Sequence, residues 1–286
     1  MTVCVAVQVN DCIVFAADSE TSLIGTDAAG AAQVTNVYNH GKKVFNLHKR
    51  LPIVAMTAGM GSLAGSSIEV VAKDFRGLLM GDDPEWRLDD LNYSIDDVAR
   101  KAYRYVYEQQ YLQDPNRQLG EFSFELYVGG FETGSRLGEI WKISIVNGNC
   151  AGPAQVARPG DSGIWWSGQP DAINRIVLGY SSAVIDVLAD AGVQPDQLEQ
   201  LVTALRERAI AQLTHPAMPV QDAIQVADFL VSLTIDFTKF LPGANTVGGA
   251  IDVATVTRHE GFKWVRRKHY YPCELNPLET DHVGGR

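Results

Sequence analysis

The sequence is poor in the cysteine patterns that mark disulfide-rich and zinc-binding proteins. It has only four cysteines in 286 residues: Cys4, Cys12, Cys150 and Cys273. No pair has C-x-x-C spacing, and no histidine stands near them at zinc-finger spacing. We therefore expect reduced, mostly buried thiols. No metal and no cofactor is expected.

A surplus of basic residues is also missing. Lys and Arg number 24 against 34 Asp and Glu, which gives a formal net charge of −10. Nucleic-acid binding usually requires the opposite balance, so no nucleic-acid partner is expected. The short basic stretch 263–268 (KWVRRK) is interpreted as a solvated strand face or a subunit contact.

Long apolar runs are absent as well. No run reaches the 18 residues that a membrane-spanning helix needs, so no membrane partner is expected. The N-terminal segment MTVCVAVQVN has neither a basic region nor a cleavage site of small residues, and is not a signal peptide. The expected location is the cytoplasm.

The periodicity of apolar residues predicts an α+β fold. Strands, two helices, strands, helices and strands follow one another, which favours two packed antiparallel sheets with helices outside over a βαβ alternation. One domain is expected over 1–271, with a loose tail over 272–286, and 25–30 is interpreted as a loop. The expected strands are 2–9, 12–17, 43–48, 52–58, 124–131, 139–146, 164–167, 249–257 and 262–269, and the expected helices are 66–80, 94–111, 170–189, 196–213 and 220–240.

Thr2 is the first candidate for chemistry. Methionine is normally trimmed before a small residue, and trimming would give Thr2 a free α-amino group beside its hydroxyl. An α-amine has an unperturbed pKa of about 7.7–8.0, so it can act as a general base near neutral pH. An N-terminal threonine is thus a nucleophile that carries its own base.

Three further residues add to this hypothesis. Asp18 directly follows an apolar strand, and Lys43 precedes another. A lysine near the nucleophile would lower the pKa of its amine and hydroxyl, and a carboxylate beside that lysine would hold it charged. Gly59, at a strand end, can present its backbone N–H to an oxyanion.

Taken together, these features resemble the β-type subunits of the 20S proteasome and their bacterial relatives. In that family an A-A-D-S motif follows the nucleophilic threonine at the spacing that separates Thr2 from Asp18. The resemblance spans roughly residues 2–269. The matching segments are A-A-D-S at 16–19, K-K-V at 42–44, the strand ending in A-G at 53–59, G-G-A-I at 248–251 and G-F at 261–262.

The resemblance implies a four-layer αββα sandwich of the Ntn-hydrolase type. It implies Thr2 as the nucleophile, Asp18 and Lys43 as its support and the Gly59 N–H as oxyanion donor. It also implies peptide or unfolded-protein substrates, self-assembly into a ring-like homo-oligomer and a possible unidentified activator. By the same resemblance, Thr21, Gly41, Thr57 and Gly61 would line an uncharged pocket for a neutral apolar side chain.

The sequence departs from the family pattern at three places. The Asp and Ser that usually help to position the terminal amine align with Ala244 and Val247, which can do neither. A second Ser of the family aligns with Asp161 or Ser162, so the resemblance implies one of these two as the partner of the amine; the alternative is a poorly positioned amine and low activity. The segment between Asp18 and Lys43 is also longer than in the family, and its extra residues at 25–35 are interpreted as a surface insertion that could reshape the cleft.

Three readings of function remain open. The first is a threonine-type endopeptidase subunit of a proteasome-like ring. The second is another Ntn amidase that acts on a small amide. The third is a catalytically weak, structural ring subunit, which the retained Thr2, Asp18 and Lys43 argue against and Ala244 and Val247 argue for.

Overall fold

The computed structural model describes residues 2–26, 32–117, 122–243 and 245–268. Two five-stranded antiparallel sheets form its centre. The first sheet has the order β12 (Gly163–Gly168), β1 (Val3–Gln8), β2 (Cys12–Ala17), β13 (Asp252–Thr257) and β14 (Gly261–Arg266). The second has the order β11 (Pro153–Ala157), β10 (Glu139–Val146), β9 (Ser123–Gly130), β6 (Ile53–Ala58) and β5 (Val44–Asn46).

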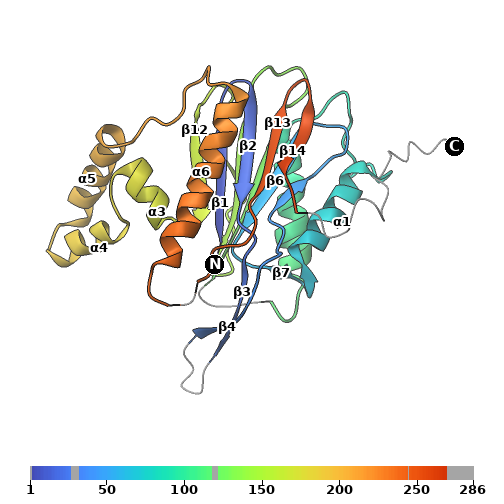
Figure 1. The fold of residues 1–286 in the computed structure, drawn as a ribbon. Helices are drawn as coiled ribbons and strands as arrows, with labels where there is room; N and C mark the ends of the chain where they lie inside the picture. Colours follow the sequence, from blue (N-terminus) through green and yellow to red (C-terminus); the bar gives the residue numbers. More distant parts are fainter. Residues whose placement is uncertain (1, 27–31, 118–121, 244, 269–286) are drawn as a thin grey trace.

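Helices cover the outer face of each sheet, so the fold has four layers, α, β, β and α (Figure 1). The helix α6 (Val220–Lys239) packs on β1 and β2. On the second sheet lie α1 (Ile68–Met80) and α2 (Ile95–Tyr103), which continues as a π-helix, η1 (Arg104–Tyr111). Ser67 and Ser94 cap α1 and α2 by accepting a hydrogen bond from a first-turn N–H. The predicted α+β fold class and αββα sandwich are confirmed.

The strand β1 is buried on both faces, and its alternation decides which way Thr2 points. Val3, Val5 and Val7 pack toward α6, whereas Cys4 and Ala6 face the second sheet. Because side chains alternate along a strand, the residue before Val3 continues the set that faces the second sheet. Thr2 is therefore placed at the open end of the space between the two sheets.

Of the predicted loop at 25–30, the structure describes only Gly25 and Thr26, which belong to a strand, and the rest lies outside the described residues. Here the chain forms a hairpin of β3 (Thr21–Thr26) and β4 (Ala32–Tyr38), which projects from the sandwich near the N-terminus (Figure 1). The small residues of this segment hid its alternating pattern. The strand β11 and the two-residue strands β7 (Ser62–Leu63) and β8 (Ser66–Ser67) were not predicted either.

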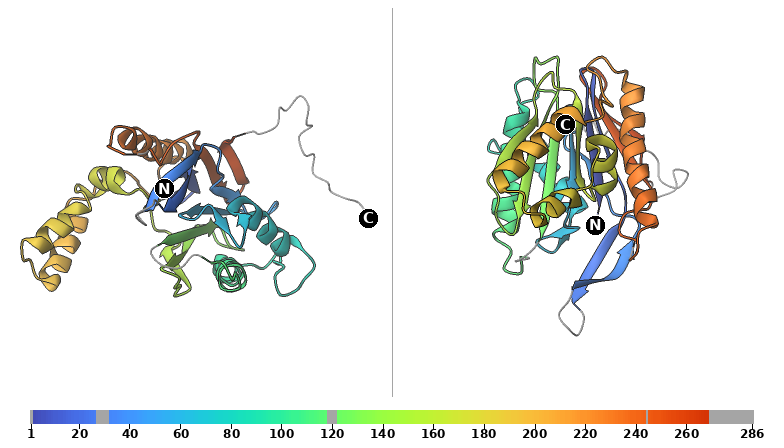
Figure 2. Two further views of the ribbon diagram at one scale, coloured as in Figure 1. Left: turned by 90° about the horizontal axis from the view of Figure 1, so that it is seen from below. Right: turned by 90° about the vertical axis from the view of Figure 1, so that its left-hand side faces the viewer.

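The single helix expected over 170–189 is wrong. The chain instead forms α3 (Asp171–Ile173) and η2 (Asn174–Leu178), and turns at Gly179, whose φ of 81° is left-handed. After the turn come α4 (Ala183–Asp190) and α5 (Pro195–Arg208), an arm that extends away from the sandwich (Figure 2).

No single helix in the described part of the chain is long and apolar enough to cross a bilayer. The pair 171–178 and 183–190, bent by 83°, meets the length and composition requirement when taken together.

Candidate active site

Thr2 directly precedes β1 and is held there by its main chain. The Gln169 N–H donates to the Thr2 carbonyl oxygen at 2.7 Å. Gly168, with φ of 94°, lies so close that a Cβ there would overlap this oxygen, so only glycine fits. The side chain of Thr2 is buried, with 4% of the residue exposed, and lines a cleft. The end of β12 thus fixes the candidate nucleophile.

Asp18, fully buried at the end of β2, is the centre of a hydrogen-bond network. Its Oδ1 accepts from the Val3 N–H at 3.0 Å and from Lys43 Nζ at 2.5 Å. Its Oδ2 accepts from the N–H groups of Glu20 and Gly248, both at 3.1 Å. Both carboxylate oxygens are therefore occupied, and Asp18 connects the strand of Thr2, the lysine and the segment before β13.

Lys43 is the cation of this network. It is 7% exposed, and its Nζ donates to the Asp18 carboxylate and, at 2.6 Å, to the Glu20 carbonyl oxygen. Its own carbonyl accepts from the Thr57 N–H at 2.9 Å, which fixes its backbone against β6. The structure thus places Asp18 and Lys43 together, and Lys43 lines the same cleft as Thr2.

Gly59 follows β6 at the wall of the cleft and has a left-handed φ of 100°. A Cβ at this position would overlap the carbonyl oxygen of Ser123, so the turn requires glycine for both conformation and space. The Cys4 thiol donates to the Thr57 carbonyl at 2.9 Å, which ties β1 to this wall. Burial raises the pKa of Cys4, so its thiol stays protonated at neutral pH.

The cleft has a volume of about 400 Å³. Thr21, Gly41, Thr57 and Gly61, the expected pocket residues, all line it. The cleft is not free of charge, however, as its other lining residues include Glu20, Lys42, Lys43 and Glu69, and Lys42 pairs with Glu69 at 2.8 Å. The base of the hairpin also contributes to it, since Thr21, Ser22 and Tyr38 belong to the cleft wall, whereas none of the residues 25–35 that were interpreted as an insertion is among its lining residues.

Asp161 and Ser162 are not brought to Thr2, which corrects their assignment as amine partners. In the antiparallel pair of β1 and β12, Val3 lies opposite Gly168, whereas Gln8 lies opposite Gly163. Asp161 and Ser162 precede Gly163 and so lie at the far end of β1. There Asp161 Oδ2 accepts from the Arg158 N–H at 2.8 Å.

The segment before β13 supports the site through its backbone. Ala244 lies outside the described residues, and Val247 is buried in the apolar cluster between the first sheet and α6. Gly248 donates its N–H to Asp18, and its carbonyl accepts from the Ser19 N–H at 2.9 Å. At the end of β12, Ser167 lies opposite Cys4, and its hydroxyl bonds to the Tyr127 hydroxyl at 2.6 Å. Ser167 is a polar group near Thr2 that the sequence analysis missed.

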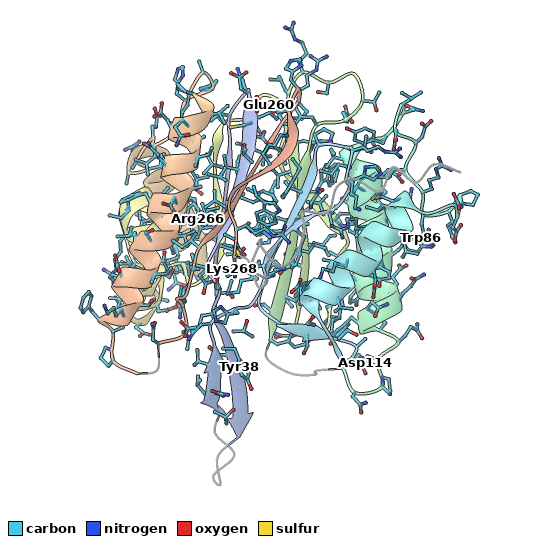
Figure 3. All side chains as sticks on the ribbon, turned by 45° about the vertical axis from the view of Figure 1, so that its right-hand side comes forward. Tyr38, Trp86, Asp114, Glu260, Arg266 and Lys268 are labelled. Carbon is cyan, nitrogen blue, oxygen red and sulfur yellow. The ribbon has the colours of Figure 1, made fainter. Side chains whose placement is uncertain are left out.

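Lys268 is a second residue that the sequence analysis missed. Its stretch was interpreted as a solvated strand face or a subunit contact, but its side chain is buried, and Figure 3 shows it above the hairpin that carries Tyr38. Its Nζ bonds to the Ser19 hydroxyl, to the Gly41 carbonyl at 2.6 Å and to Asp252 at 3.1 Å. Burial lowers the pKa of Lys268 more than Asp252 raises it.

Replacing Lys268 with methionine is expected to lower the free energy of unfolding by about 3 kcal/mol, since it leaves Asp252 buried without its cation. Arg266→Met is the matched control. Arg266 pairs with Asp228 at the surface, and its loss should cost less than about 1 kcal/mol. Urea unfolding measures both values. Equal effects would show that Lys268 contributes no more than a surface pair.

Two remaining expectations concern metals and cysteines. Among the described residues, no group of three or more His, Cys, Asp or Glu side chains could hold a metal ion. Cys4, Cys12 and Cys150 are free thiols, and Cys273 lies outside the described residues.

Comparison with known proteins identifies the fold. No family model and no curated protein matches the sequence. Among solved structures, the chain is similar to a Gly-1 mutant of Anbu from Hyphomicrobium sp. strain MC1. The TM-score is 0.54 and the identity 18%, over 94% of this chain and 86% of that one. At this identity the likeness concerns the fold alone, which in this chain is the four-layer αββα sandwich.

Proposed function

We propose that the chain is a threonine-type peptidase subunit of a proteasome-like ring. The observation that carries this proposal is the convergence of Thr2, Lys43 and Gly59 on one cleft, with Asp18 fixing Lys43 from behind. Once Met1 is removed, the Thr2 hydroxyl attacks the peptide carbonyl and its own α-amine takes up the proton. The amine then passes the proton to the leaving nitrogen.

The surroundings of Thr2 support a role for each partner. The Lys43 ammonium, a positive charge at the cleft wall, favours the oxygen anion that forms at Thr2 during attack. The N–H at Gly59 stands at the same wall, where it can donate to the negatively charged oxygen of the tetrahedral intermediate. A cleft of about 400 Å³ is large enough for a few residues of an extended peptide.

Substitution at Thr2 tests this function on fluorogenic peptides. Thr2→Ala should abolish turnover, whereas Thr2→Ser should keep part of it because hydroxyl and amine both remain. A mass spectrum of the purified protein checks the premise that Met1 is absent. Full turnover by Thr2→Ala would refute the peptidase assignment.

Ring assembly forms part of the proposal and would enclose the active sites in an inner chamber. Exposed apolar side chains on the helices support this part of the proposal. Phe229 lies on α6 and Phe240 directly after it, and Val187 and Leu201 lie on the arm. Sedimentation at micromolar concentration should reveal an oligomer, and a monomer would count against this part. We place the protein in the cytoplasm as part of the same proposal.

A second candidate is a structural ring subunit with weak activity. Val247, whose buried side chain cannot reach the amine, favours it. Assembled and trimmed protein that fails to turn over any peptide would support this second candidate.

A further inference from the structure

Glu20 lies in the wall of the cleft, and the proposed mechanism does not yet use its carboxyl group. The residue is 4% exposed and shares the cleft wall with Thr2. Its backbone is fixed on both sides, since its N–H donates to Asp18 Oδ2 at 3.1 Å and its carbonyl accepts from Lys43 Nζ at 2.6 Å. The network that holds Asp18 and Lys43 therefore also fixes the point from which the Glu20 side chain extends.

The Glu20 carboxyl fills the space that a side chain at position 248 would occupy. A Cβ on Gly248 would overlap Glu20 Oε2, so this oxygen lies directly against the glycine. The neighbouring Val247 turns its side chain into the cluster beside α6. The segment before β13 supplies no polar side chain here through Val247 or Gly248. The Glu20 carboxyl, which comes from the segment after β2, is therefore the polar group at this place.

The two lysines that line the cleft form ion pairs with carboxylates other than that of Glu20. Lys43 pairs with Asp18, and Lys42 pairs with Glu69. In the part of the chain that the structure describes, no Lys, Arg or His nitrogen forms an ion pair with Glu20. Burial, followed by the nearby charge of Asp18, raises the pKa of Glu20. A buried carboxylate is costly unless a cation or hydrogen-bond donor accompanies it.

We propose that the Glu20 carboxylate accepts a hydrogen bond from the α-ammonium of Thr2 and orients it in the cleft. This inference rests on the proposed function, because it requires Thr2 as the first residue. Asp18 cannot take this role, since four donors already occupy its two oxygens. Glu20 is thus a positioning residue: it acts through the amine and supplies the anchor that Ala244 and Val247 do not.

The pKa of the α-amine tests this role without any turnover. Protein with Thr2 as its first residue is prepared by cleaving an N-terminal ubiquitin fusion, and its start is checked by mass spectrometry. The rate at which acetic anhydride modifies the Thr2 amine is then followed against pH. In Glu20→Gln the amine pKa should fall by about one unit, because an adjacent negative charge has been removed.

Glu139→Gln is the matched control. Glu139 is also a buried acid with a pKa raised by burial, but it begins β10, opposite Gly130 and away from the cleft. It should leave the amine pKa unchanged. The titratable groups around the cleft and beneath it are the same in all three proteins: Asp18, His40, Lys42, Lys43, Glu69 and Lys268.

The outcomes separate this inference from the proposed function. An unchanged amine pKa in Glu20→Gln overturns the inference, even when peptide hydrolysis falls, because a purely structural Glu20 would lower activity and thermal stability only. Glu20→Asp retains the charge but shortens the side chain, and should restore most of the amine pKa. Wild-type protein with no hydrolysis at all, but with the Glu20-dependent pKa, would refute the peptidase assignment and leave the positioning role standing.

Discussion

Asp18→Ala is expected to lower the free energy of unfolding by about 3–5 kcal/mol, the largest loss of stability from any single change at the site. The substitution leaves Lys43 buried without its anion. It also removes the acceptor of three backbone N–H groups, those of Val3, Glu20 and Gly248. A buried donor left without a partner costs about 1–3 kcal/mol.

Urea unfolding of Asp18→Ala beside Asp171→Ala measures this effect. Asp171 also pairs with a cation, Arg175, but that pair is one-third to one-half exposed. Its loss should therefore cost about 1 kcal/mol or less. Similar unfolding midpoints for the two variants would contradict the central place given to Asp18 in the network.

Lys43→Met is expected to lower peptide turnover by about 100- to 1000-fold, the range found when a group that stabilises transition-state charge is removed. Methionine preserves the aliphatic volume of the lysine. Asp18 keeps its three backbone donors, so the fold should survive. The measurement is kcat/KM on a fluorogenic peptide, with circular dichroism to confirm the fold.

Lys101→Met serves as its control. Lys101 is a mostly buried lysine in an ion pair with Asp97, but both residues lie on α2, away from the cleft. Turnover by this variant should stay within about twofold of the wild type. If Lys43→Met also stays within twofold, Lys43 is not the lysine that assists Thr2.

The sequence allowed the sandwich to be predicted because its strands are short, β-branched and well separated. The A-A-D-S segment also fixes Asp18 at the end of β2. The convergence of Thr2, Asp18 and Lys43 depends on strands that are close in sequence and pair directly or face each other across the sandwich. Contacts between strands that are close in sequence can be predicted from short motifs.

Relations between distant segments could not be predicted in this way. Lys268 reaches Ser19 from the other end of the chain, and its alternating basic neighbours resemble an ordinary exposed strand. Asp161 and Ser162 were placed at the site because the register of β12 on β1 cannot be read from one sequence. Glu20 was missed because its importance depends on a glycine at position 248 that makes room for it.

The measurement that tests the nucleophile most directly is the reaction with a peptide epoxyketone. An N-terminal threonine offers the hydroxyl and the amine on one residue, and the two together can close a morpholine ring with the probe. Mass spectrometry of trimmed, assembled protein, followed for hours, should show one adduct per chain on Thr2 and none in Thr2→Ala. If no adduct forms even at millimolar probe, Thr2 is not a catalytic nucleophile and the chain is better described as a structural ring subunit.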